Sequence, residues 1–291
     1  MDFKKALNDK QQLINKRLED LLSYVDAPQI IIEAMKYSLF AGGKRIRPIL
    51  CIAVCEALEG NLEDVLDVAC SIEMIHTYSL IHDDLPAMDN DDYRRGKLTN
   101  HKVYGDAIAI LAGDGLLNYA FETLLKVIKI KNDKRFVDAA FEIAKASGIT
   151  GMIGGQVIDI TNVGNIIDEN LLVSMHERKT GKLIEASCNV GAIIANRYEY
   201  LEITREYSKN LGVAFQIVDD ILDVIGDEKK LGKSVGKDAK NNKPTYVTLY
   251  GLEKSRELAK EFSLKAVELA NKIDNTGFLK DLTKYLLNRE S

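Results

Sequence analysis

Apolar side chains recur along most of the chain at intervals of three or four residues, the spacing that gathers them on one face of an α-helix. The 291 residues contain only 4 prolines, so few positions interrupt this pattern. It predicts helices that begin at Pro28 and Gly151, and others over residues 3–24, 48–58, 62–85, 104–130, 133–147, 168–196, 199–226, 245–272 and 276–289. No segment alternates apolar and polar residues as a strand does. The pattern therefore indicates an all-α fold, and the chain length allows one large domain or two small ones.

Two acidic stretches stand out from the apolar pattern. Residues 80–96 (Leu-Ile-His-Asp-Asp-Leu-Pro-Ala-Met-Asp-Asn-Asp-Asp-Tyr-Arg-Arg-Gly) place five carboxylates and two arginines directly after an apolar run. Residues 215–223 (Phe-Gln-Ile-Val-Asp-Asp-Ile-Leu-Asp) place three carboxylates inside one. On a helix Asp223 lies about 40° from Asp219 and about 60° from Asp220, so all three share a face. Like charges at this spacing repel each other, and we therefore expect a bound cation.

The ligand types indicate which cation this is. The candidate ligands are oxygens, which favour Mg²⁺, Mn²⁺ or Ca²⁺ over zinc. Mg²⁺ is usually held by one or two carboxylates together with phosphate oxygens. An EF-hand starting at Asp89 is excluded, because Tyr93 and Arg94 stand at its fifth and sixth positions. A solvated acidic turn is an alternative for the first stretch and a weaker one for the second, which lies among apolar residues.

Two residues near the first stretch affect its geometry. Asp83 and Asp89 are six residues apart, about 240° around a continuous helix. Pro86 disrupts the helical turn before it, so a break there would return Asp89 to the side of Asp83. His76 precedes Asp83 by two turns and falls on nearly the same face, about 10 Å along the axis. It is either a core histidine or part of the same site.

Cations are clustered although the net charge is −5, which implies no general attraction to nucleic acid. Lys44, Arg45 and Arg47 follow Gly42-Gly43, where the preceding helix is expected to end. A cationic turn before a helix start can cradle an anion, although a plain basic turn has the same composition. Three more cations close the first acidic stretch, at Arg94, Arg95 and Lys97.

Glycine and lysine mark three further segments. Gly181, in Lys179-Thr180-Gly181-Lys182, costs about 1 kcal/mol relative to alanine within the predicted helix, so we expect a kink or a functional reason. The glycines at 151–155 lack the Gly-Lys-Ser/Thr of a phosphate loop and indicate close helix packing. Residues 227–244 contain nine charged residues, six of them lysines. They predict either a solvated loop or a lid.

Cysteine content and hydropathy bear on location. Cys51, Cys55, Cys70 and Cys188 lack a zinc-like pairing with histidine, and we expect Cys51 and Cys55 to be core thiols. The charged N-terminus does not resemble a signal peptide, which makes the cytoplasm the expected location. No segment offers about 18 uncharged apolar residues, so no membrane span is expected.

Taken in order, several motifs carry a resemblance that extends over nearly the whole chain. The chain closely resembles the trans-isoprenyl diphosphate synthases, and among them the bacterial farnesyl diphosphate synthases. The four residues between the second and third aspartates of the first motif are typical of bacterial and plant members. The matching motifs are Gly43-Lys44-Arg45-x-Arg47-Pro48, His76, Asp83-Asp84-x4-Asp89, Arg94-Arg95-Gly96, Gly155-Gln156-x2-Asp159, Lys179-Thr180-Gly181 and Phe215-Gln216-x2-Asp219-Asp220-x2-Asp223.

The resemblance implies one domain over residues 1–291, an all-α helical bundle around a deep central pocket, and usually a homodimer. It also implies three Mg²⁺ ions, for which Mn²⁺ substitutes, held between the two aspartate motifs. The implied ligands are Asp83, Asp89 and Asp219, with Asp84, Asp220 and Asp223 close by.

The resemblance also implies the substrates and the reaction. Arg94, Lys179, Thr180, Gln216 and Lys233 would hold an allylic substrate, dimethylallyl or geranyl diphosphate. Lys44, Arg47, His76 and Arg95 would hold isopentenyl diphosphate. The residues expected to promote ionisation of the allylic diphosphate, by stabilising its leaving group, are Asp83, Asp84, Asp89, Asp219 and Lys179.

Product length is expected to depend on residues below the first motif. Ser79 lies about 6 Å and Tyr78 about 7.5 Å along the helix axis from Asp83. In the family, an aromatic residue five positions before the first aspartate is typical of fifteen-carbon synthases, so Tyr78 predicts farnesyl diphosphate. Tyr78 is also about 140° around the helix from Asp83, so another residue would form the pocket floor if Tyr78 points away.

Four other functions fit parts of the sequence. A geranylgeranyl diphosphate synthase differs only in product length. A terpene cyclase shares the fold and the ionisation step but needs no second diphosphate site. A His-Asp phosphohydrolase would use His82-Asp83 but needs a metal-binding histidine well upstream, and the first histidine is His76. A non-catalytic subunit usually lacks one aspartate motif, and both are complete here.

Overall fold

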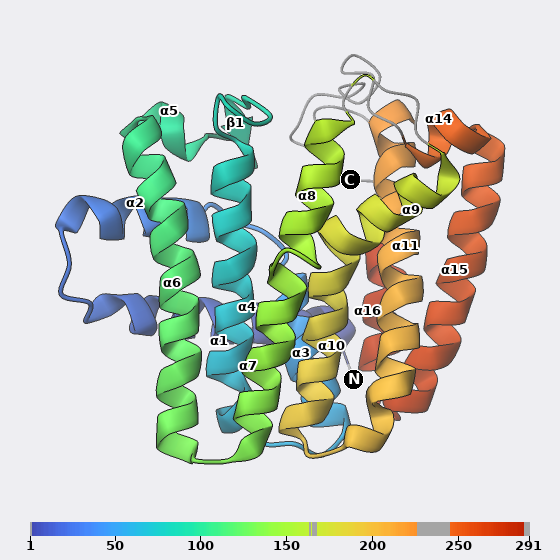
Figure 1. The fold of residues 1–291 in the computed structure, drawn as a ribbon. Coiled ribbons are helices and arrows are strands. Elements are labelled where there is room, and N and C mark those ends of the chain that lie inside the picture. Colours follow the sequence, from blue (N-terminus) through green and yellow to red (C-terminus); the bar gives the residue numbers. More distant parts are fainter. Residues whose placement is uncertain (1, 163, 165–167, 226–244, 288–291) are drawn as a thin grey trace.

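Helices make up nearly all regular structure in the computed structural model, which describes residues 2–162, 164, 168–225 and 245–287 (Figure 1). The all-α prediction is confirmed. The helices in chain order are α1 (Phe3–Ser23), α2 (Gln29–Leu39), α3 (Ile46–Ala57), α4 (Leu62–Asp83), α5 (Asn100–Tyr104), α6 (Asp106–Lys131), α7 (Lys134–Ser147), α8 (Met152–Thr161), α9 (Glu169–His176), the π-helix η1 (Glu177–Gly181), α10 (Lys182–Ile194), the 3₁₀ turn η2 (Tyr198–Tyr200), α11 (Leu201–Ile225), α14 (Tyr246–Tyr250), α15 (Leu252–Ile273) and α16 (Phe278–Leu287).

The structure corrects several predicted boundaries. The helix predicted over 168–196 is divided into α9, η1 and α10, and the one over 245–272 is divided at Gly251, whose φ is 78°. α2 ends at Leu39, before the glycine pair expected to cap it, and α4 ends at Asp83 instead of residue 85. A short antiparallel hairpin, β1 (Tyr93–Arg94) and β2 (Lys97–Leu98), was not predicted, because two-residue strands leave no alternating pattern.

The core is built from helices that pack side by side along the bundle, with α4 against α6, α3 against α10, and α11 against α15 (Figure 1). Ala109 and Ala112 of α6 are fully buried, whereas Ile110 and Leu111 between them are exposed. Small side chains there let the α4 and α6 backbones approach each other closely. Cys51 and Cys55 are buried free thiols, as predicted, and burial raises their pKa.

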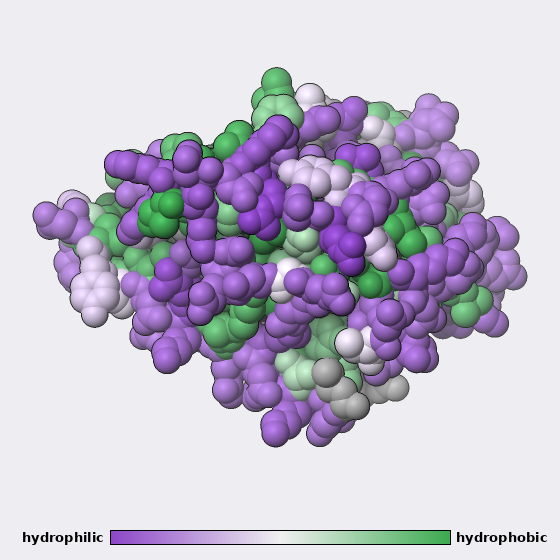
Figure 2. Space-filling model, turned by 90° about the horizontal axis from the view of Figure 1, so that it is seen from below, coloured by the Kyte–Doolittle hydropathy of each residue, from purple (hydrophilic) through white to green (hydrophobic). Residues whose placement is uncertain are grey.

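Chain direction places the two aspartate motifs at the same end of the bundle (Figure 1). α4 and α11 both run toward the upper end of the bundle in Figure 1, and the motifs occupy their carboxyl-terminal ends. The opposite end carries mostly hydrophilic residues (Figure 2). The upper end is therefore where a site can form from residues far apart in the sequence.

Among the described residues, one helix, α6, is long and apolar enough by length and composition to cross a membrane. This is weak evidence for a span, because the core helix of a bundle has the same properties, and α6 packs against α4. The absence of a span and the cytoplasmic location both stay predictions.

Candidate active site

The chain reverses direction directly after α4 and folds the first motif back on itself. The backbone N–H of Asp89 donates to the carbonyl of Asp83 at 2.9 Å, and that of Asp91 donates to the carbonyl of Asp84 at 3.2 Å. Asn90 adopts a left-handed conformation with φ 50° within this turn. The break expected at Pro86 therefore exists, and it returns Asp89 to Asp83.

Asp84 faces an arginine. Arg94 on β1 donates from Nε and Nη2 to the Asp84 carboxylate at distances of 2.6–2.9 Å. Asp84 is only 3% exposed, and burial raises its pKa although Arg94 opposes the rise. This two-pronged contact holds the Arg94 guanidinium against Asp84.

Three cationic or basic groups interact here: Arg47 at the start of α3, His76 on α4, and Arg95 in the turn after β1. Arg47 Nη1 lies 3.3 Å from His76 Nε2. Burial, followed by the charges of Arg47 and Arg95, holds the pKa of His76 well below its usual range, so the imidazole is neutral at pH 7. Arg95 adopts φ 53° in the hairpin turn and donates from Nη1 to the Gly42 carbonyl. Gly43 has no room for a side chain, since a Cβ would lie 2.6 Å from Arg95 Nη1.

Arg45 does not belong to this cationic group, which corrects the cradle of three cations expected at residues 44–47. Its Nη1 pairs with Glu73 Oε1 at 2.8 Å, and both side chains are 2% exposed. The Lys44 ammonium lies 5.6 Å from the centre of the Tyr285 ring, and its predicted binding role stays a prediction. Of the three cations, Arg47 lines the cavity described below.

The π-helix η1 presents the second basic element. A π-turn contains one extra residue, and such turns are frequent at functional sites. Lys179 Nζ pairs with Asp159 Oδ2 of α8 at 2.6 Å. Gly155 of α8 allows this approach, because a Cβ there would lie 2.2 Å from the Lys179 backbone nitrogen. The kink expected at Lys179-Thr180-Gly181 is thus a π-helix.

The second aspartate motif is connected to η1 by hydrogen bonds. Thr180 Oγ1 donates to Gln216 Oε1 at 3.4 Å, and Gln216 Nε2 donates to Asp220 Oδ1 at 2.9 Å. Asp220 also accepts from the backbone N–H of Tyr246, the first residue of α14, at 2.8 Å. Asp220 and Asp223 are buried, whereas Asp219 is half-buried.

One cavity of about 320 Å³ brings many of the predicted residues together. Its polar wall contains Arg47, His76, Ser79, Asp83, Lys179 and Thr180. Its apolar wall contains Tyr78, Leu80, Met88, Met152, Ile153, Val157 and Ile160, with His82 and Gln156 between. Tyr78 is therefore among the residues that line the cavity, and its role as the pocket floor stays a prediction.

The residues present fit Mg²⁺. The side-chain ligands of both motifs are carboxylate oxygens, which suit this ion. Burial, together with Asp89 and against Lys179, raises the pKa of Asp83 to about 6. Within the described ranges, no three Asp, Glu, His or Cys side chains form a ready-made cage.

Some predicted residues lie outside this description, and some contacts were not predicted. Lys233 and the suggested lid over residues 227–244 fall outside the described residues. No role was predicted for Asp159, although it pairs with Lys179. Its position in the motif Gly155-Gln156-x2-Asp159 is the sequence signal that could have indicated one. The apolar wall from α8 was not predicted, because nothing in the sequence indicates which face of α8 meets α4.

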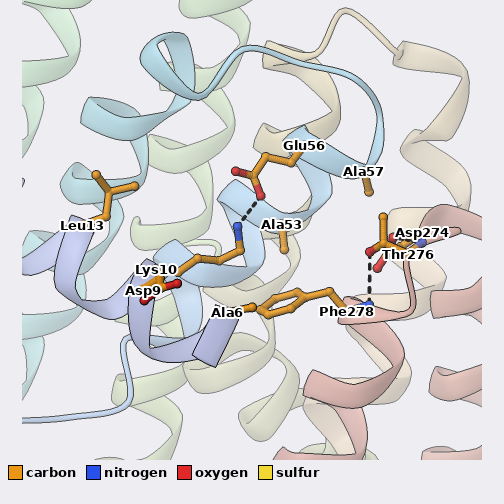
Figure 3. Close-up of a pocket in the computed structure, with 10 residues that line it drawn as sticks. All are labelled: Ala6, Asp9, Lys10, Leu13, Ala53, Glu56, Ala57, Asp274, Thr276 and Phe278. Carbon is orange, nitrogen blue, oxygen red and sulfur yellow. Dashed lines mark hydrogen bonds and ion pairs between the residues drawn. The ribbon is translucent and has the colours of Figure 1, made fainter. Parts of the chain in front are cut away.

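A second cavity, of about 330 Å³, lies between α1, α3 and the turn before α16 (Figure 3). Lys10 and Glu56 form an ion pair across it. It shares no residue with the first cavity and contains neither aspartate motif. We therefore assign the chemistry to the first cavity.

Comparison with known proteins adds to this geometry. A sequence profile described as polyprenyl synthetase matches residues 28–284. The chain is 46% identical over 276 residues to the chloroplastic geranylgeranyl pyrophosphate synthase of Capsicum annuum, covering 94% of this chain and 74% of that one. It is 46% identical over 264 residues to the farnesyl diphosphate synthase of Geobacillus stearothermophilus, covering 88% and 87%. The solved geranyltransferase from Helicobacter pylori, complexed with magnesium and isoprenyl diphosphate, has a TM-score of 0.83 and 32% identity, covering 97% of this chain and 96% of that one.

Proposed function

The chain belongs to the polyprenyl synthetase family, and from this premise we propose that it makes (2E,6E)-farnesyl diphosphate. It is a prenyltransferase, and its family is Mg²⁺-dependent and uses isoprenyl diphosphates. The proposed reaction joins isopentenyl diphosphate head-to-tail to dimethylallyl diphosphate and then to geranyl diphosphate. The observation that carries the proposal is the 320 Å³ cavity, which is lined by Asp83, Lys179, Arg47 and His76 and by Tyr78 and apolar residues of α8.

The polar end suits two diphosphates that react with each other. Lys179 and Thr180 on η1, with Arg94 above Asp84, would bind the allylic diphosphate and stabilise its departure. Asp83, Asp89 and Asp219 would hold the metal, with Asp84, Asp220 and Asp223 supporting them. We propose three Mg²⁺ ions, which would supply positive charge to the leaving group.

The isopentenyl site would use the group at the start of α3. Arg47 has a buried Nε without a hydrogen-bond partner among the described residues, which is a donor that a phosphate oxygen would satisfy. His76 is neutral and adds a hydrogen-bonding group without charge. Arg95 completes the set, and this second anion site favours a synthase over a terpene cyclase, which needs only one diphosphate site.

The apolar wall would set the product. A growing tail extends away from the diphosphates along α4 and meets the ring of Tyr78, which is 6% exposed. A geranylgeranyl product is the second candidate, favoured by the name of the Capsicum annuum relative. Incubation of the enzyme with dimethylallyl and isopentenyl diphosphates, followed by chromatography of the products, separates the two.

A matched pair of variants tests the role of Tyr78. Tyr78→Ala removes the ring and should shift the product toward twenty carbons. Tyr78→Phe keeps the ring and removes only a hydroxyl that has no partner among the described residues, so it should still give fifteen carbons. If Tyr78→Ala stays active and makes only farnesyl diphosphate, Tyr78 does not limit the length of the product.

We also propose a homodimer. Large apolar side chains are exposed on α6, on α7 and in the turn before α8, including Leu125, Phe141 and Ile149, at 64%, 69% and 82%. Exposed apolar patches of this kind mark interaction surfaces. Light scattering after gel filtration should give twice the 32.5 kDa chain mass, and Phe141→Glu should reduce it to the monomer. A monomeric unmodified chain would reject this part of the proposal.

A further inference from the structure

His82 lies between the cavity and α6, one helical turn from Tyr78 on the way to Asp83. Its ring meets that of Tyr78 edge-on, with centroids 5.7 Å apart and planes at 79°. Its Nε2 lies 3.0 Å from the backbone carbonyl oxygen of Ile110, the geometry of a hydrogen bond that imidazole donates. The Asp114 carboxylate is farther away, at 3.8 Å.

The sequence of α6 makes room for this imidazole at one position. A Cβ added at Gly113 would lie 2.1 Å from His82 Nε2 and 2.4 Å from its Cδ2. Even alanine would therefore displace the ring. Glycine within a helix costs about 1 kcal/mol relative to alanine, so its presence here has a packing reason, which the contact with His82 supplies.

The orientation of Tyr78 depends on such contacts. Its hydroxyl has no hydrogen-bond partner among the described residues, so packing alone holds the phenol ring in place. His82 is one of the groups that pack on it and is itself fixed to the α6 backbone. Both rings line the cavity that contains Asp83 and Lys179.

We propose that His82 is a positioning residue for product length: held against α6 over Gly113, it keeps the Tyr78 ring across the path of the growing tail. This inference rests on the proposed farnesyl product. It gives a positioning role to a histidine that binds neither diphosphate. It also makes product length depend on a contact between α4 and α6.

Four variants test the proposal with one readout, the ratio of twenty- to fifteen-carbon product at matched total turnover. His82→Ala removes both contacts, and Gly113→Ala displaces the imidazole. For each we expect the ratio to rise about two- to tenfold, the factor associated with loss of one aromatic edge contact. His82→Gln retains a side-chain N–H for the Ile110 carbonyl and should return the ratio toward that of the unmodified enzyme.

Gly115→Ala is the matched control. It adds the same methyl group to the same helix, but it faces the flexible Met35 side chain, with a Cβ-to-sulfur distance of 3.1 Å, and not His82. Its product ratio should not change. Thermal denaturation identifies any variant that fails to fold, and if His82→Ala does so, Gly113→Ala and His82→Gln decide the question.

The outcomes separate this inference from the proposed function. If the unmodified enzyme makes farnesyl diphosphate, and the variants His82→Ala and Gly113→Ala also make it, His82 does not position the residue that limits product length. The proposed function then stands. The inference also fails if Gly115→Ala shifts the ratio as much as Gly113→Ala, or if His82→Gln restores nothing. If the unmodified enzyme makes geranylgeranyl diphosphate, Tyr78 does not end elongation at fifteen carbons, and both proposals fail.

Discussion

Replacing Glu73 by leucine should destabilise the protein strongly, because it leaves the Arg45 charge buried without its counter-ion. The two side chains are each 2% exposed and meet at 2.8 Å. Arg45 also donates to Asn15 Oδ1 at 2.9 Å and to the Leu39 carbonyl, so its guanidinium cannot turn to water without breaking those bonds. Arg45 precedes α3 with φ 53°, and its anchors therefore also fix the start of the helix that presents Arg47.

The magnitude follows from the burial. Removing one partner of a buried ion pair costs about 3–5 kcal/mol, a large part of the roughly 5–15 kcal/mol that stabilises a typical domain. Glu73→Gln keeps an acceptor for one hydrogen bond and should cost less, about 1–3 kcal/mol. Arg45→Met combined with Glu73→Leu removes both charges. The double variant should therefore be more stable than Glu73→Leu alone.

Urea unfolding followed by circular dichroism measures these differences, provided that the slope with denaturant stays constant across the variants. The four proteins of the double-mutant cycle give the coupling between the two side chains directly. A loss below about 1 kcal/mol for Glu73→Leu would refute the argument from burial. So would a double variant whose loss equals the sum of the two single losses, because the charges would then act independently.

Three further predictions concern the active site. EDTA should abolish turnover and Mg²⁺ should restore it, and Asp83→Ala or Asp219→Ala should lower kcat by orders of magnitude; full activity in chelator would contradict this. Arg47→Ala should raise the KM for isopentenyl diphosphate about 10- to 100-fold, as for loss of a charged hydrogen bond, and should affect the allylic KM less; equal effects would reject the division between the two sites. The pKa of Asp83 is raised to about 6, so its neutral form is favoured as the pH falls through 6 and protons compete with the metal. The Mg²⁺ concentration for half-maximal rate should therefore increase below pH 6, and a flat titration between pH 5 and 8 would contradict this.

Much of the fold could be predicted because helix signals are local. Apolar spacing identified the long helices. The boundaries that were wrong depend on contacts that are remote in sequence. Gly155 meets Lys179 across 24 residues at the π-helix, and the hairpin at Tyr93–Leu98 is too short to leave a pattern.

The aspartate motifs were predictable because their charges stand within apolar runs, where an uncompensated carboxylate is costly. What each neighbouring residue does was less predictable. The sequence does not show that Asp84 faces Arg94, that Asp220 binds the first N–H of α14, or that His82 reaches α6. Those contacts depend on side-chain direction and on which elements lie opposite, and both are set by the tertiary fold.

The arginines show how the fold divides residues that look equivalent in the sequence. Arg45 and Arg94 each pair with a buried carboxylate, Glu73 and Asp84. Within the described residues, no ion pair involves Arg47 or Arg95. Burial lowers the pKa of both, that of Arg47 to about 10, because their charges are held at the site without a matching carboxylate. A diphosphate would relieve that cost by supplying the missing charge, and a protein of net charge −5 thereby binds two anionic substrates at one end of its bundle.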